Sequence, residues 1–182
     1  MSALTAGRNT VRKTPDTLYL PMAAGAVIYA GSIVCVDADG YAVPGADTAD
    51  YSVAGICKDD PANPGVGSFD NSGGDDGDAH VCVWRVGRFR LDCHRTPTQD
   101  MLGACVYVVD DQTVTPHEWD VDNDVLFGVI TALPGTTLAL DPHAQFGTDE
   151  VEVEMVPGCR EWTGDLTTTT EAPTTTTTTA QG

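Results

Sequence analysis

The sequence predicts an all-β domain over residues 18–160, a small β-barrel or β-tulip-like fold, with an extended N-terminal arm at 1–17 and a Thr-rich tail at 161–182. Short alternating or β-branched runs recur along the chain, separated by turns rich in Gly, Pro and Asp. Single glycines interrupt several of these runs, as they do where a strand bulges or bends. No ten-residue stretch has the spacing of an amphipathic helix, so fewer than about a tenth of the residues are expected in helices.

The strongest strand signal lies at residues 81–91, directly after an acidic, turn-rich loop at 70–78. Its side chains alternate between two faces, which predicts a half-buried strand. Gly87 interrupts the alternation before the apolar rhythm resumes. A glycine inside such a run predicts a bulge, or a sharp bend where the strand turns a corner.

Shorter strands are expected on both sides of this run. Pro21 ends the first of them and marks it as an edge strand, because proline cannot donate to a sheet ladder. Gly55 and Gly128 lie inside later strands and predict further bulges. Residues 59–79 are expected to form a long loop. The other expected strands are 18–21, 26–29, 33–36, 41–43, 51–58, the hairpin 103–114, 125–133, 137–140 and 150–156.

The charge is strongly acidic and unevenly placed. The chain has 9 Lys and Arg against 27 Asp and Glu, a net charge of −18. Such a surface repels nucleic acid and anionic membranes, so neither is an expected partner. The first 20 residues nevertheless have a net charge of +2, through Arg8, Arg12 and Lys13 against Asp16. These three cations predict an arm that binds a neighbouring molecule or lattice; a merely solvated arm is the alternative.

The last 16 residues include ten threonines and no apolar side chain larger than Ala or Pro. Such a segment buries too little surface to offset its ordering entropy, so we expect a flexible tail. A glycosylated stalk and a segment that winds with two copies of itself are the alternatives. No apolar run of 18 residues and no signal peptide are visible, so neither a membrane span nor export is expected.

The six cysteines show no C-x-x-C spacing, so a zinc ribbon is not expected. Without an export signal the default is reduced thiols that pack as small hydrophobic groups. Cys35, Cys82 and Cys105 lie within apolar strands, and we expect each of them to be buried and unpaired.

Three Asp-rich turns, at 37–40, 70–78 and 120–124, resemble pieces of a calcium loop. An EF-hand needs Glu at its twelfth position, and counting from Asp120 that position is Thr131. We interpret these acids as turn formers, with a weak surface cation site as the alternative. No nucleophile elbow, metalloprotease motif or phosphate-binding loop is present, so neither a catalytic site nor a cofactor is expected.

Four segments in order along the chain carry a family resemblance. They are AGAVIYAG at 24–31, DNSGGDDGD at 70–78, GRF at 87–89 and GACVYVVDDQTV at 103–114. Over about residues 3–133 the chain resembles the small head-decoration, or capsid cement, proteins of tailed bacteriophages and Mu-like prophages. The strand expected after Gly147 and the Thr-rich tail extend beyond that pattern.

The resemblance implies a structural virion protein and not an enzyme. It would bind the major capsid protein on the outer surface of the capsid, commonly as a homotrimer, and brace the shell against internal DNA pressure. It would be made in the host cytoplasm, and Arg8, Arg12 and Lys13 would reach neighbouring subunits.

Two other functions stay open from the residues alone. The first is a β-rich fibre or adhesin-like module, in which the body or the tail binds a host-surface glycan or protein. The second is a β-barrel hydrolase, whose site would be assembled by the fold from residues that no local motif reveals.

Overall fold

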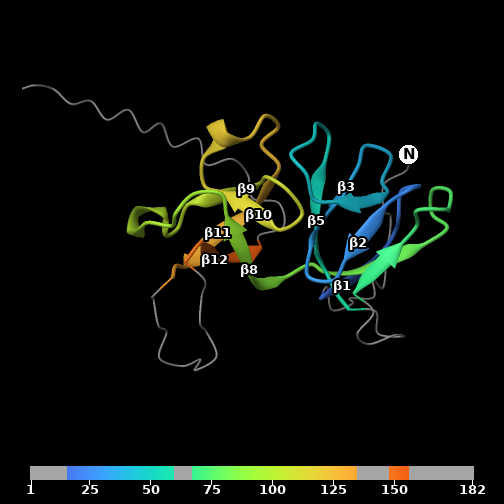
Figure 1. Ribbon diagram of the computed structural model, residues 1–182, viewed down its shortest axis with the longest axis horizontal. Helices are drawn as coiled ribbons and strands as arrows, with labels where there is room; N and C mark the ends of the chain where they lie inside the picture. Colours follow the sequence, from blue (N-terminus) through green and yellow to red (C-terminus); the bar gives the residue numbers. More distant parts are fainter. Residues whose placement is uncertain (1–15, 60–66, 135–147, 156–182) are drawn as a thin grey trace, which may run out of the picture.

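The computed structural model describes residues 16–59, 67–134 and 148–155, and these form strands, turns and two 3-10 turns. The prediction of an all-β fold is confirmed (Figure 1). The 3-10 turns are Gln99–Met101 and Glu118–Asp120. The strands are β1 Thr17–Pro21, β2 Val27–Tyr29, β3 Ile33–Val36, β4 Ala42–Pro44, β5 Ser52–Cys57, β6 Ser68–Asp70, β7 His80–Trp84, β8 Gly87–Cys93, β9 Cys105–Val108, β10 Thr113–Thr115, β11 Leu126–Ala132 and β12 Glu150–Met155.

Five strands close into a barrel in the order β10-β8-β12-β11-β9, which lies at the left of Figure 1. All neighbours are antiparallel except β10 and β8, which run parallel. The expected hairpin at 103–114 supplies β9 and β10 and closes the barrel. The register between β11 and β9 shifts between Leu126 and Gly128, so the bulge predicted from Gly128 is confirmed.

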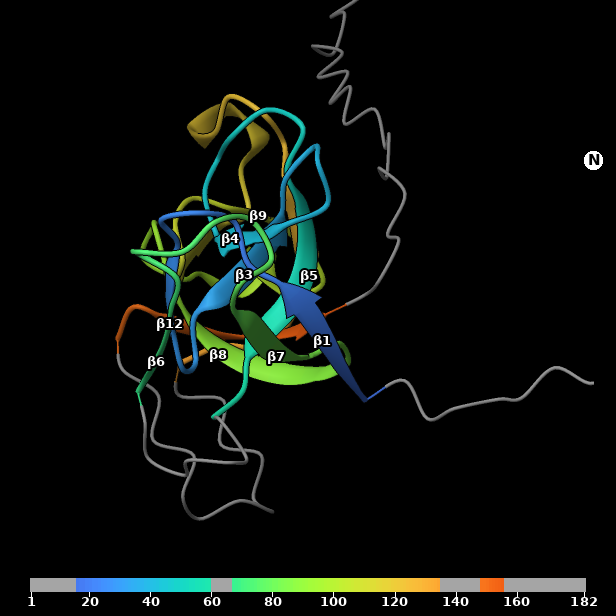
Figure 2. The same ribbon diagram turned by 90° about the vertical axis from the view of Figure 1, so that its right-hand side faces the viewer.

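A second, open sheet lies at the right of Figure 1, with antiparallel strands in the order β1-β7-β5-β3-β4. Figure 2 views the molecule from this side and shows β1, β7 and β5 next to one another. β1 is an edge strand, as Pro21 predicts. The register between β3 and β5 shifts beside Gly55, which has a φ of 156°. The bulge predicted at Gly55 is therefore confirmed.

The chain passes from the open sheet to the barrel at Gly87. β7 ends at Trp84 in the open sheet, and β8 begins at Gly87 in the barrel with a φ of 147°. The predicted corner is confirmed. The half-buried strand is confirmed for β8, where exposed Arg90 and Asp92 alternate with buried Leu91 and Cys93, but it is wrong for β7. Val81, Cys82 and Val83 are all buried, because β7 lies inside the sheet between β1 and β5, whereas Trp84 at the end of β7 is 37% exposed.

One strand was not predicted. β6 lies within the expected long loop 59–79 and pairs with β2 as a separate two-stranded sheet, placing Phe69 opposite Ile28. Three residues are too few to show an alternating pattern, and only the contact with β2 defines them as a strand.

The open sheet has a hydrophobic core on each face. The larger core fills the barrel around Phe127 and reaches the open sheet through Ile33, Cys35 and Ile56. The smaller core lies between the other face of the open sheet and the β2–β6 pair, and contains Met22, Ala26, Ile28, Val34, Ala42, Cys57, Val81 and Val83. The molecule is therefore layered as barrel, open sheet and β2–β6 pair.

Candidate interaction surfaces

The candidate binding residues Arg8, Arg12 and Lys13 lie outside the described residues. The structure does place the start of the body. β1 begins at Thr17, and the Asp16 carbonyl accepts a hydrogen bond from the Arg85 amide at 3.1 Å. The chain therefore enters the body along the edge strand of the open sheet, beside the corner between β7 and β8.

The acidic loop 70–78 is hydrogen-bonded to a distant part of the chain. Asn71 is 4% exposed, and its amide nitrogen donates to the carbonyls of Ala23 at 2.8 Å and Asp75 at 3.0 Å. The Asp76 carboxylate accepts a hydrogen bond from the Ala24 amide at 2.7 Å. The loop is thus bound to the chain between β1 and β2, about 50 residues earlier in the sequence.

The other carboxylates of this loop act as turn formers, as expected. Asp70 accepts a hydrogen bond from the Ser72 amide at 2.8 Å, and donation from the Ser72 side chain and backbone lowers the pKa of Asp70. Asp78 accepts a hydrogen bond from the Asp75 amide at 2.9 Å. Within the described residues, no three His, Cys, Asp or Glu side chains are arranged to hold a metal ion.

A second group of polar contacts, between Arg95, Thr115 and Asp120, lies at one end of the barrel. The Arg95 guanidinium donates to both carboxylate oxygens of Asp120, with Nε at 2.6 Å from Oδ2. The Thr115 hydroxyl donates to the same Oδ2 at 2.9 Å. The Asp120 side chain is only 7% exposed, and the Arg95 contact holds the pKa of this carboxyl well below its usual range. The sequence predicted Asp120 to be a turn former, with a weak cation site as the alternative, and gave no sign of this ion pair, because Arg95 lies 25 residues away.

We expect Asp120→Asn to lower the free energy of unfolding at neutral pH and to reduce its acid dependence. A carboxyl whose pKa is lower in the folded state stabilises the protein above its unfolded pKa of about 3.9, and loses this effect as the pH falls. The difference between the wild type and the variant should therefore shrink below about pH 4. Urea denaturation across this range measures it.

The exposed Asp122 is the matched control for this comparison. Asp122→Asn should leave the acid dependence close to that of the wild type. Equal pH profiles for the Asp120 and Asp122 variants would contradict the role given to Asp120.

An exposed aromatic side chain, Trp119, directly precedes Asp120 in the second 3-10 turn. Trp119 is 71% exposed and stacks on His117, with ring centroids 4.4 Å apart. Asp47, in the loop between β4 and β5, accepts hydrogen bonds from the amides of Asp122 at 2.6 Å and Asn123 at 2.9 Å. An exposed tryptophan on a turn fixed from both sides is typical of a surface that binds a partner. It was missed from the sequence, where a Trp inside the acidic segment 115–124 was the available signal.

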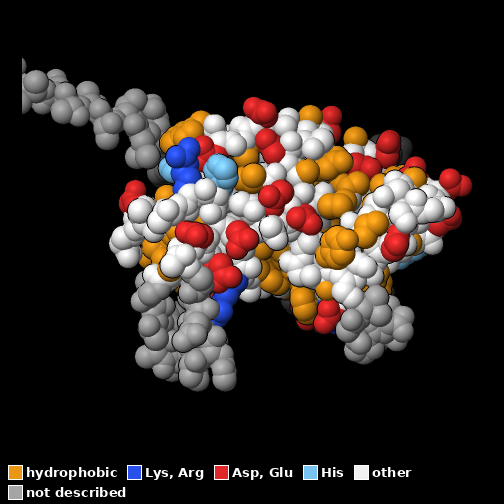
Figure 3. All heavy atoms as spheres, in the orientation of Figure 1, with side chains coloured by type: hydrophobic (Ala, Val, Ile, Leu, Met, Phe, Trp, Pro, Cys, Tyr) orange, Lys and Arg blue, Asp and Glu red, His pale blue; other side chains and the backbone are white. Residues whose placement is uncertain are grey.

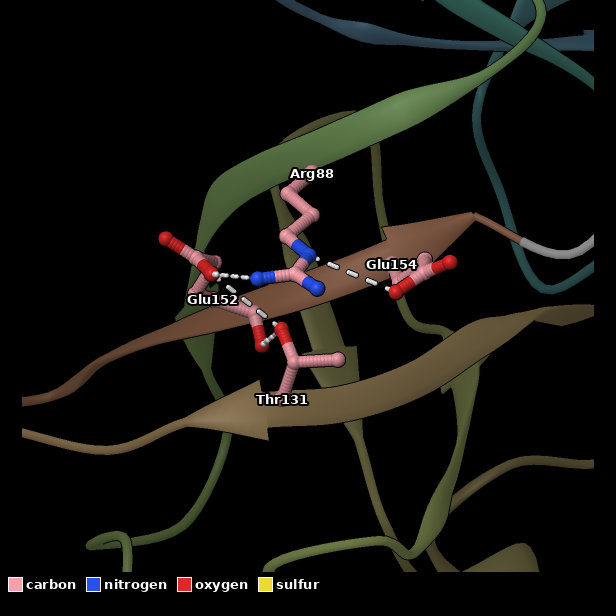
Figure 4. A network of polar contacts seen from close by, with 4 residues as sticks. All are labelled: Arg88, Thr131, Glu152 and Glu154. Atoms are coloured by element: carbon pink, nitrogen blue, oxygen red, sulfur yellow. Dashed lines mark hydrogen bonds and ion pairs between the residues drawn. The ribbon is translucent and has the colours of Figure 1, made fainter.

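The outer face of the barrel carries a network of charged side chains (Figure 4). Arg88 of β8 lies 3.3 Å from Glu154 and 3.8 Å from Glu152, both on β12. The Thr131 hydroxyl of β11 donates to the Glu152 carboxylate at 3.2 Å. Val151 and Val153 are fully buried between these positions, so the predicted charged outer face of this strand is confirmed. Exposed ion pairs contribute about 0–1 kcal/mol each, so this network fixes register more than stability.

No disulfide links the five cysteines that the structure describes. Cys35 and Cys82 are buried as predicted. Cys105 has no disulfide, as predicted, but its predicted burial is wrong, because this residue is half-buried. On β9 the inward positions are Val106 and Val108, which places Cys105 on the other face. Cys159 lies outside the described residues.

Burial raises the pKa of Cys35 to about 11 and that of Cys57 to about 12. Their thiolate populations near pH 8 are therefore very small, and we expect neither to be alkylated by iodoacetamide before the protein unfolds. Cys105 should react faster, because it is partly accessible. Mass spectrometry of labelled peptides measures the order. Labelling of Cys35 or Cys57 ahead of Cys105 in the folded protein would contradict it, and all six thiols should react after denaturation.

Acidic side chains are spread over the whole face seen in Figure 3, whereas Lys and Arg gather in a few places. Within the described ranges, none of the helical turns has the length and apolar composition that a bilayer crossing requires. Searches against protein-family models, curated proteins and solved structures found no match to this chain. The interpretation of these surfaces therefore depends on their geometry and on the segments that carry the resemblance.

Proposed function

We propose that this chain is a structural virion protein that binds the outer surface of a tailed-phage capsid and stabilises it. The segments that carry the resemblance include turns and the corner between β7 and β8. All four contain glycines with a positive φ, namely Gly25 at 75°, Gly31 at 86°, Gly77 at 84°, Gly87 at 147° and Gly103 at 86°. L side chains rarely adopt these angles, so these positions are required by the backbone and not by chemistry.

The contact between two of these segments is the observation that carries the proposal. The Asn71 amide donates to the Ala26 carbonyl at 2.8 Å, and the Gly25 amide donates to the Asn71 carbonyl at 3.0 Å. The first and second segments are 38 residues apart in the sequence, and they are hydrogen-bonded to each other in the fold. Such a pairing supports a shared framework as the source of the resemblance, and a shared framework supports a shared role.

The proposed partners are the major capsid protein and further copies of the chain in a homotrimer. The charge supports a place on the outer surface, because a body with a net charge near −20 would be repelled by packaged DNA on the inner side. The protein would reach the capsid after synthesis in the host cytoplasm. No cofactor and no catalytic step are part of the proposal.

Purified heads that lack their decoration protein test the proposal. The full chain should co-sediment with them to a saturating copy number and should raise the temperature at which they release DNA. Heads already decorated by the same protein are the control and should bind no more of it. Failure to bind undecorated heads from the parent phage would overturn the proposal.

One observation favours the second candidate, a module that binds a host-surface glycan or protein. Trp119 is exposed and is held by its stacking on His117, an arrangement that suits stacking against a sugar ring. Binding to host cells that Trp119→Ala abolishes, with no binding to heads, would select this candidate instead. Binding to heads that Trp119→Ala leaves unchanged would exclude Trp119 from the capsid contact.

We expect a chain that lacks residues 2–15 to fold normally but to bind heads more weakly. The deletion stops before β1, so it removes the cations Arg8, Arg12 and Lys13 and no described strand. Charge reversal at these three positions should weaken binding most at low salt, because salt screens exposed charges. Sedimentation with heads across a salt series measures the effect.

A chain that ends at residue 166 is the control for the arm deletion, because it loses only residues 167–182, which hold ten threonines and no cation. Its occupancy on heads should match that of the full chain. If the arm deletion also decorates heads as tightly as the full chain at every salt concentration, the arm is a solvated terminus.

A further inference from the structure

The barrel-facing side of the open sheet is uncovered near its edge. One row of paired residues crosses this face from β3 to β1, in the order Ile33, Ile56, Trp84 and Thr17. Ile33 and Ile56 are buried against the barrel at 0% and 3% exposed, whereas Trp84 is 37% exposed. Tyr19, two residues beyond Thr17 on the same face of β1, is 61% exposed. The exposed fraction of the side chains on this face therefore rises from β3 toward β1.

The contacts of Trp84 define the shape of this uncovered face. Phe89 of the barrel lies beside it, with ring centroids 6.4 Å apart. Lys58 approaches from β5, with its ammonium nitrogen 5.7 Å from the Trp84 ring centroid. Val86, in the link between β7 and β8, is 42% exposed. The barrel thus covers one side of the indole and leaves Tyr19, Trp84 and Val86 partly exposed around the buried Cys82. We call these three side chains the apolar strip, and burying them would be favourable.

The chain leaves the described structure beside this strip. β12 runs antiparallel to β8 and ends at Met155, which is paired with Gly87. Met155 therefore lies beside the corner at Gly87, from which Val86 and Trp84 lead into the open sheet. Gly87 follows Trp84 by three positions, a span of about 10 Å, whereas seven residues beyond Met155 reach up to about 25 Å. Residues 156–162 are therefore long enough to cross the strip from Val86 to Tyr19.

The sequence of this segment is VPGCREW, which differs from the Thr-rich residues that follow it. It begins with the apolar pair Val156 and Pro157 and ends with Trp162, the one aromatic residue in the sequence after β12. We propose that residues 156–162 dock on the uncovered face between β1 and β8, with Trp162 packed against Trp84 and Tyr19. The segment clasps the edge of the open sheet to the barrel within one chain, and this contact does not depend on the proposed capsid function.

Trp84 reports on this contact as the single tryptophan of a chain that carries Trp119→Phe and Trp162→Phe. This chain is compared with the same chain ending at residue 155 and, as the matched control, ending at residue 166. Loss of the segment should raise the acrylamide quenching constant of Trp84 about twofold, because the indole loses its apolar cover. The chain ending at 166 should match the full-length reporter.

A second comparison tests the side chain without shortening the protein. In the same reporter, alanine at position 162 in place of phenylalanine should expose Trp84, and Leu166→Ala should not. The variants change only residues outside the described strands, so the body should stay folded, and circular dichroism checks this.

Three results would overturn the proposal. Equal quenching in the full-length reporter and in the chain ending at 155 would show that the segment does not cover Trp84. Protection that grows with protein concentration would assign the strip to a second copy of the chain. Protection that arises only on heads would assign it to the capsid, a result that would leave the proposed function standing while the clasp fails.

Discussion

Gly128→Ala should lower the free energy of unfolding by about 3 kcal/mol or more, and the folded population should fall accordingly. Gly128 lies on β11 between its partners Val106 on β9 and Met155 on β12. A Cβ atom at this position would overlap the backbone carbonyl of Glu154. The overlapping atom is backbone in a paired strand, so relief requires β11 and β12 to separate. Chemical denaturation monitored by circular dichroism measures the loss.

Gly73→Ala is the matched control, because a Cβ there meets no atom within 4 Å. It should change the free energy of unfolding by less than about 0.5 kcal/mol. Gly55→Ala should behave like Gly128→Ala, since its Cβ would overlap the Trp84 carbonyl and its φ is 156°. A Gly128→Ala protein as stable as the Gly73→Ala protein would contradict the close approach of β11 and β12.

Much of the local structure could be predicted because it depends on neighbouring residues. The β-branched runs predicted strands, and the glycines at 55, 87 and 128 predicted the two bulges and the corner. The pairing order could not be predicted. β8 joins β10 in parallel and β12 in antiparallel, and these contacts join segments about 20 and 60 residues apart. Alternation within β8 indicates which side chains share a face, but it does not indicate which strands pair with β8.

The same limit applies to the candidate surfaces. The acids of the loop 70–78 were recognised as turn formers, because Asp accepts hydrogen bonds from nearby amides. The role of Asn71 could not be inferred, because its acceptors include a carbonyl 48 residues away. The error at Cys105 was avoidable, since alternation with Val106 and Val108 already places it on the outer face. The exposure of Trp119 had no local signal in the sequence beyond its acidic context.

Asn71→Ala should lower the free energy of unfolding by about 3 kcal/mol. The substitution removes a buried amide that donates to the carbonyls of Ala23 and Asp75 and lies 3.4 Å from that of Met22. Both bonds are partly buried, and a carbonyl shielded from solvent that loses its donor costs about 1–3 kcal/mol. The small side chain also leaves a void around the buried position 71. Urea denaturation of the purified variant measures the change.

Asn123→Ala provides the matched control, since that exposed amide donates a similar bond, to the Asp47 carbonyl at 3.1 Å, in contact with solvent. It should cost less than about 1 kcal/mol. Asn71→Asp adds a test with an opposite pH dependence to that of Asp120. A buried carboxylate facing carbonyl oxygens has its pKa raised in the folded state, so the stability of this variant should fall as the pH rises above about 4. Equal losses for the alanine variants at 71 and 123 would show that the loop is not bound to the chain before β2 through Asn71.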